Sequence, residues 1–290
     1  MKKLLALLTI LTILLFGCSI DPKQTQIVAT TLPVYEFTAA LCENTNITVS
    51  QLVTENVSCL HDYTLQVPQV QMLENAEIVI TSGAGLDSFV LDVVTNTTVC
   101  IDASQNISLL CADAHHEHLH GHNHDDGDPH IWLSPINAKI MVDNIYNALL
   151  TSYPEHKTLF AKNLFNLHSK LDTLYNYGIK ELANLTNRNC ITFHDGFAYL
   201  ADTFDLHILR AIEEESGSEA SALEIIELIT LIDTHKVAAI FTERNGTASS
   251  ANILHSETGV PVYELDMAMS GNSYFDAMYH NINTLKEALQ

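Results

Sequence analysis

Basic residues are scarce in this sequence, with 13 lysines and arginines against 35 aspartates and glutamates and a formal net charge of −22. Proteins that bind nucleic acids present clustered positive charge, so this balance excludes a nucleic-acid partner. The excess of carboxylates favours cations near the surface, although most individual carboxylates need no role beyond keeping the protein in solution.

Two common arrangements of metal-binding residues are also missing, namely a Cys-x-x-Cys pair and a His-Glu-x-x-His motif on a predicted helix. No Cys-x-x-Cys pair is present, which argues against a structural zinc knuckle. No predicted helix carries the His-Glu-x-x-His motif of zinc proteases. Five cysteines remain when Cys18 is set aside, namely Cys42, Cys59, Cys100, Cys111 and Cys190. Five is odd, so a monomer keeps at least one unpaired thiol, and the sequence leaves the pairing open.

Long apolar runs are absent after the first twenty residues, so we expect the body of the protein to lie outside the membrane. Lys2 and Lys3 precede an apolar run over residues 4–16, whose length is typical of a secretory signal core. Residues 15–18, Leu-Phe-Gly-Cys, resemble the bacterial lipobox, where cleavage leaves a lipid-modified cysteine. We predict a signal peptide over 1–17, lipidation of Cys18 and a tether over 18–25, rather than an uncleaved helical anchor.

From residue 27 onward, short β-type runs alternate with helical patterns. We expect strands at 27–30, 47–53, 77–81, 98–101, 190–193, 207–210, 237–241 and 261–265. Strands that alternate with helices are typical of parallel sheets with helical crossovers, and the pattern occurs twice. The sequence therefore predicts an α/β protein with two lobes, each with a parallel sheet flanked by helices.

A long helical pattern separates the two halves, with apolar residues at helical spacing from Phe160 to Leu182. We predict one stiff connecting helix over residues 154–187, between an N-terminal lobe over 26–153 and a C-terminal lobe over 188–290. Ser134 before Pro135 and the capping-box pair Ser221 and Glu224 indicate helix starts. Gly259 indicates a helix end.

Histidines are concentrated in one segment, where six of them and four carboxylates fall within residues 115–128. The segment contains too few apolar residues to form a core, and we therefore predict a histidine-rich loop over 113–128. Neutral imidazole is a favoured ligand for zinc, copper and nickel, so the loop should bind such metals weakly and several at a time. The accessory ligands are His115, His116, His118, His120, His122 and His124.

A tighter site needs ligands on rigid supports, and four candidates lie at the ends of predicted elements: His61, His130, His194 and Asp266. In open α/β sheets, ligands bind outside the carboxyl ends of parallel strands, where His194 and Asp266 are expected. Three imidazoles with one carboxylate or water form a tetrahedral site suited to zinc. Any one of these histidines alone is more often a packed or surface residue.

Several segments that surround these candidates match a known family, and Asp128-Pro129-His130-Ile131-Trp132-Leu133-Ser134-Pro135 is the most specific of them. The others are 28–35, 61–63, 76–80 with 82–87, 194–200, 218–222 and 240–243. Over nearly the whole chain after the tether, the sequence resembles the metal-binding lipoproteins that serve ABC importers for zinc and manganese.

The resemblance implies two α/β lobes joined by a long helix, with metal in the cleft between them. It implies His61, His130 and His194 as ligands, with Asp266 at the fourth position, and an ABC permease as partner. Residues 54–60 and 64–67 depart from the family pattern around His61. This departure places Cys59 near the site as a candidate soft ligand, although a buried structural cysteine is the commoner role.

The ligand types indicate the metal. Manganese relatives typically use a carboxylate at the third position, because hard oxygen ligands suit that ion, whereas this sequence has His194 there. We therefore expect a monomeric, extracytoplasmic protein, lipid-anchored to the bacterial cell membrane, that captures Zn2+ for an ABC importer. The alternatives are a manganese-binding relative, a surface adhesin, which no repeat or stalk supports, and a zinc-dependent hydrolase. Asp266 would fill the position that a catalytic water needs, so we expect no enzyme activity.

Overall fold

The structure, a computed structural model, describes residues 27–57, 60, 63–110, 127–213, 220–244 and 248–290. The predicted signal peptide, the predicted lipidation site Cys18 and the predicted tether lie outside these residues. His61, Cys59 and the histidines of the predicted loop also lie outside them. None of the helices in the described part of the chain combines the length and the hydropathy that a membrane span requires.

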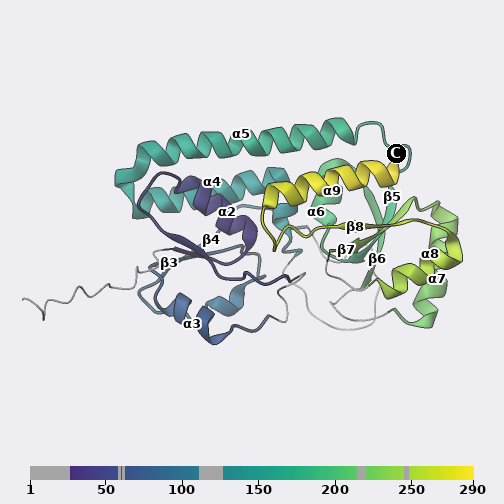
Figure 1. Cartoon of the computed structure of the whole chain (residues 1–290), viewed down its shortest axis with the longest axis horizontal. Helices are drawn as coiled ribbons and strands as arrows, with labels where there is room; N and C mark the ends of the chain where they lie inside the picture. Colours follow the sequence, from purple (N-terminus) through teal and green to yellow (C-terminus); the bar gives the residue numbers. More distant parts are fainter. Residues whose placement is uncertain (1–26, 58–59, 61–62, 111–126, 214–219, 245–247) are drawn as a thin grey trace, which may run out of the picture.

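Two four-stranded parallel sheets form the centres of two lobes (Figure 1). The N-terminal sheet has the order β2-β1-β3-β4 and the C-terminal sheet the order β6-β5-β7-β8. The strands are β1 (Ile27–Ala29), β2 (Val49–Gln51), β3 (Ile78–Thr81), β4 (Val99–Asp102), β5 (Asn189–His194), β6 (His207–Glu213), β7 (Ala239–Glu243) and β8 (Val262–Leu265). The predicted α/β class and all eight predicted strands are confirmed, with shifts of a few residues at their ends.

Helices cover both sheets, as parallel strands require for their crossovers. They are α2 (Leu32–Leu41), α3 (Val67–Glu74), α4 (Pro135–Ser152), α5 (Lys157–Glu181), α6 (Ala198–Phe204), α7 (Ala222–His235), α8 (Ser249–Thr258) and α9 (Tyr274–Leu289). Short 3-10 turns are η1 (Ser88–Val90), η2 (Ile131–Leu133) and η3 (Pro154–His156). The predicted caps are present: Ser134 accepts from the Asn137 amide, Ser221 and Glu224 form a capping box, and Gly259 ends α8 in the left-handed conformation.

Helix α5 runs along both lobes and contacts α4 and α9 (Figure 1). Its 25 residues extend roughly 38 Å at about 1.5 Å per residue. A β-carbon at Gly178 would lie 2.3 Å from the Phe204 ring, so the glycine permits close packing of α5 on the C-terminal lobe. The helix starts after η3 and ends before Leu182, which makes it shorter than the segment 154–187; the limits of the lobes remain a prediction.

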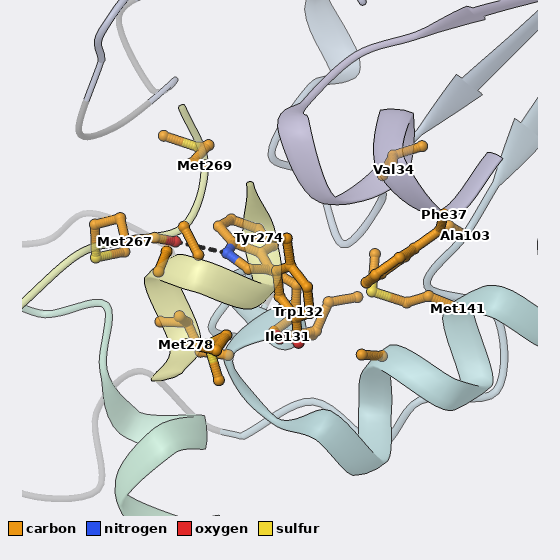
Figure 2. Close-up of a cluster of buried hydrophobic side chains, with 14 of the residues drawn as sticks. Val34, Phe37, Ala103, Ile131, Trp132, Met141, Met267, Met269, Tyr274 and Met278 are labelled. Carbon is orange, nitrogen blue, oxygen red and sulfur yellow. Dashed lines mark hydrogen bonds between the residues drawn. The ribbon is translucent and has the colours of Figure 1, made fainter. Parts of the chain in front are cut away.

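The lobes share one continuous apolar core, whose central part is drawn in Figure 2. Trp132, just ahead of α4, is fully buried and donates its indole N–H to the Met267 carbonyl oxygen at 2.8 Å. Tyr274, at the start of α9, donates its hydroxyl to the Trp132 carbonyl oxygen at 2.8 Å and packs edge-on against Phe37 of α2. Separating the lobes would expose these aromatic side chains, so the junction resists opening.

Candidate functional site

Three of the four predicted metal ligands fall within the described residues, and all three are buried. His130 immediately precedes η2, His194 is the last residue of β5, and Asp266 directly follows β8. Their exposed fractions are 1%, 6% and 7%. His61 lies outside the described residues, so its position relative to the others stays a prediction. Polar residues so deeply buried require partners or ligands.

His130 is oriented by Asp128, two residues before it. One oxygen of Asp128, Oδ1, accepts from the His130 backbone N–H at 2.8 Å and lies 2.8 Å from the ring Nδ1. A carboxylate at this distance holds the proton on Nδ1 and leaves the lone pair on Nε2, the arrangement found in metal-binding histidines. The second oxygen of Asp128, Oδ2, is buried without a hydrogen-bond partner among the described residues, so its negative charge is available to attract a cation.

His194 is placed by the end of β5 and faces a second carboxylate. Its Nδ1 lies 3.6 Å from Oε1 of Glu243, the last residue of β7 and 8% exposed. Its Nε2 is buried and has no hydrogen-bond partner among the described residues. A buried imidazole nitrogen without a partner is costly, and a metal ion would satisfy it. Gly196 lies against the ring, since a β-carbon there would be 2.7 Å from the His194 Cδ2 atom.

The two histidine rings meet edge to face. Their centroids are 5.2 Å apart and their planes cross at 89°. His130 comes from the segment before α4 and His194 from the C-terminal sheet, so residues distant in sequence converge at the boundary between the lobes. Two buried imidazoles, each with a carboxylate beside Nδ1, could supply two of the four ligands of a tetrahedral zinc site.

The backbone N–H, the carbonyl oxygen and both carboxylate oxygens of Asp266 each have a hydrogen-bond partner. The side-chain amide of Asn281, on α9, accepts from the Asp266 backbone N–H and donates to its carbonyl oxygen, both at 2.7 Å. Its Oδ1 accepts from the Ala268 backbone N–H at 2.8 Å and its Oδ2 from Arg244 at 2.7 Å. In the part of the chain that the structure describes, no three histidine, cysteine or acidic side chains group closely enough to hold a metal. The structure therefore does not bring His130, His194 and Asp266 together as a metal-binding group of their own, and His61, outside the described residues, is the further predicted ligand.

Tyr199 of α6 joins the two ends of the segment that contains the histidine-rich loop. Its hydroxyl accepts from the Leu110 backbone N–H at 3.0 Å and donates to the Asp128 carbonyl oxygen at 2.8 Å, while the Asp128 N–H donates to the Leu110 carbonyl oxygen at 2.8 Å. Burial raises the pKa of Tyr199 to about 12, so the hydroxyl keeps its proton. The segment that contains the loop thus starts beside Asp128 and ends at Asp128, two residues before His130.

The roles of Asp128, Glu243, Asn281, Arg244 and Tyr199 were missed by sequence reasoning. Asp128 carried a usable signal, because an acidic residue two positions from a candidate ligand can orient it. Glu243 carried a weaker one, as an acidic residue at the end of a predicted buried strand. Asn281, Arg244 and Tyr199 have no local signal, since their partners are distant in sequence.

Comparison with known proteins identifies the family. The profile described as zinc-uptake complex component A periplasmic (ZnuA) matches residues 27–288. This chain belongs to that family. The zinc-binding lipoprotein AdcA of Streptococcus pneumoniae (strain ATCC BAA-255 / R6) is 29% identical over 99% of this chain and 61% of AdcA, so the chain spans about three fifths of that relative.

Solved structures of the family have the same fold. The Zn(II)-bound ZnuA-like domain of Streptococcus pneumoniae AdcA is 27% identical, with a TM-score of 0.76 over 92% of this chain and 99% of that one. A crystal structure of ZnuA is 24% identical, with a TM-score of 0.79 over 92% of this chain and 100% of that one. The two-lobed α/β fold expected from the sequence is therefore that of the ZnuA family.

Proposed function

We propose that this protein captures Zn2+ between its lobes for an ABC importer, with His61, His130 and His194 as ligands and Asp266 at the fourth position. The observation that carries the proposal is the pair His130 and His194, which meet at the lobe boundary with their Nδ1 atoms beside Asp128 and Glu243. Zinc binding by AdcA and the family's description as a zinc-uptake component support the same metal.

Zinc is favoured over manganese by the ligand types. Imidazole nitrogens suit zinc, whereas manganese binds best where oxygen ligands predominate. The third position holds His194, while Glu243 lies behind it on the Nδ1 side. The proposed set therefore has three imidazoles, with Asp266 at the fourth position, a composition that suits a tetrahedral zinc site.

Binding and delivery are the whole of the proposed activity, so no catalytic step is assigned. We place the protein outside the cytoplasm, anchored through lipid on Cys18, as a monomer whose partner is the membrane permease. The histidine-rich loop supplies six accessory ligands, His115, His116, His118, His120, His122 and His124. Its ends lie beside His130, so metal collected by the loop would be released close to the tight site.

Titration of the chain with zinc, in competition with a chromogenic chelator, tests the proposal. Three proteins are compared: the chain from Cys18 onward, the same chain without residues 115–124, and His194→Ala. We expect one tight zinc equivalent that survives removal of the loop and is lost in His194→Ala. If tight binding is lost with the loop and kept in His194→Ala, the interlobe assignment is wrong and the protein is a histidine-loop metal scavenger.

A further inference from the structure

Arg244 stands beside the proposed fourth ligand because of the register between two strands. In the β7–β8 pair, Glu243 lies opposite Leu265. The Arg244 backbone N–H donates to the Leu265 carbonyl oxygen at 2.9 Å and continues this pairing one residue beyond β7. The side chain of Arg244 is thereby brought to Asp266.

The Arg244 guanidinium group pairs with Asp266 at close range. Its Nη1 donates to Asp266 Oδ2 at 2.7 Å, and its Nε lies 3.7 Å from Glu264 Oε1. The Asp266 side chain is 10% exposed and that of Arg244 57%. Since the Ala268 backbone N–H binds Oδ1, both oxygens of Asp266 are engaged. A metal ion that takes Oδ2 must first displace a positive charge.

This displacement affects metals unequally. Zinc is well held by three imidazoles with a water molecule in the fourth place, whereas manganese depends more on oxygen ligands. We infer that Arg244 is a specificity-determining residue: by withholding the Asp266 carboxylate it disfavours manganese more than zinc. This inference rests on the proposed interlobe site, and it adds a determinant to the ligand types themselves.

Glu264 gives the displaced guanidinium group a second partner. It lies two residues before Asp266, so both carboxylates flank Arg244, and Glu264 is 54% exposed. When the guanidinium group turns from Asp266 to Glu264, Arg244 keeps an ion-pair partner at the surface. An exposed pair of this kind contributes at most about 1 kcal/mol, which corresponds to about fivefold in an equilibrium constant. Because Arg244 can exchange Asp266 for Glu264, the pair with Asp266 alters metal preference without preventing metal binding.

Dissociation constants for zinc alone and manganese alone, measured on the full chain and five variants, test the inference. The variants are Arg244→Gln, Arg244→Lys, Asp266→Asn, the double variant of Arg244→Gln with Asp266→Asn, and Arg210→Gln. Arg210→Gln is the matched control, because it removes the same charge from another partly exposed pair of the C-terminal lobe, at 3.7 Å from Glu227. Arg244→Lys keeps the positive charge and checks for a packing effect, and thermal melts check folding.

We expect Arg244→Gln to tighten manganese binding about fivefold and zinc binding by less than about twofold, so that the preference for zinc falls. Arg210→Gln and Arg244→Lys should keep the wild-type preference, and Arg244→Gln should change nothing once Asp266 is asparagine. An unchanged preference in folded Arg244→Gln would overturn the inference while leaving zinc capture intact. Tight zinc retained in His194→Ala would overturn both, because the metal would then lie elsewhere.

Discussion

Replacing Asp128 by asparagine removes a buried negative charge while keeping the shape of the side chain that orients His130. Its Oδ1 holds both the backbone N–H and the ring Nδ1 of His130, each at 2.8 Å. An asparagine carbonyl oxygen still accepts these two bonds, so Asp128→Asn tests the charge alone. Asp128→Ala removes the charge and both bonds, and leaves the ring free to turn.

Residues that orient a metal-binding histidine typically contribute about 10- to 100-fold to metal affinity. Asp128 is 6% exposed and its Oδ2 has no hydrogen-bond partner among the described residues, so little solvent or protein screens its charge. We therefore expect Asp128→Asn to weaken zinc binding about tenfold and Asp128→Ala about a hundredfold. Competition titrations with a zinc chelator at fixed pH and ionic strength measure both.

Asp143 provides the matched control for this comparison. It lies on α4 and its Oδ1 is 3.0 Å from Nε2 of His168 on α5, so it is a second aspartate–histidine pair away from the site. Asp143→Asn should leave zinc affinity unchanged. If both Asp128 variants bind zinc as tightly as wild type, or if Asp143→Asn weakens binding as much as Asp128→Asn does, Asp128 has no specific role in zinc binding.

Three further predictions concern the fold. Gly178→Ala should lower the unfolding free energy by about 1–3 kcal/mol in urea titrations because its β-carbon meets Phe204, whereas Phe165→Ala, at an exposed site on the same helix, should have little effect. Burial raises the pKa of Asp87 from 3.8 to about 6, so the native state binds this proton more tightly than the unfolded state does. The resulting stabilisation of the native state is complete below about pH 3.8 and is lost as the pH rises through 6. When the pH is lowered from 7.5 to 5, the unfolding free energy of wild type should rise by about 1 kcal/mol relative to that of Asp87→Asn in the same assay. A difference between the two proteins that stays constant with pH would contradict the raised pKa of Asp87. Because Trp132 ties the lobes together, small-angle scattering profiles with and without zinc should superimpose, and a marked compaction would refute a stiff junction.

Local patterns were sufficient to predict the sheets and the placement of His194 and Asp266 at strand ends, whereas their role as metal ligands stays a prediction. Short apolar runs separated by helical patterns indicate where strands occur, and the structure places His194 at the last residue of β5 and Asp266 directly after β8. The caps at Ser134 and Ser221 depend on neighbours within four residues, so sequence spacing predicts them correctly.

Contacts set by register and by packing between elements were not predictable in this way. Arg244 meets Asp266 only because β7 and β8 pair with one particular register. Asn281 reaches Asp266 from α9, fifteen positions later in the chain. The close approach of Gly178 to Phe204 depends on how α5 crosses the C-terminal lobe. A single sequence carries no signal for such pairs.

The most direct test of zinc capture between the lobes is an anomalous difference map, recorded at the zinc edge from crystals of the zinc-loaded protein. We predict one dominant peak about 2.0–2.1 Å from the Nε2 atoms of His130 and His194, with His61 as the third nitrogen ligand. A dominant peak elsewhere, with both of these Nε2 atoms uncoordinated, would show that the tight zinc site does not lie between the lobes.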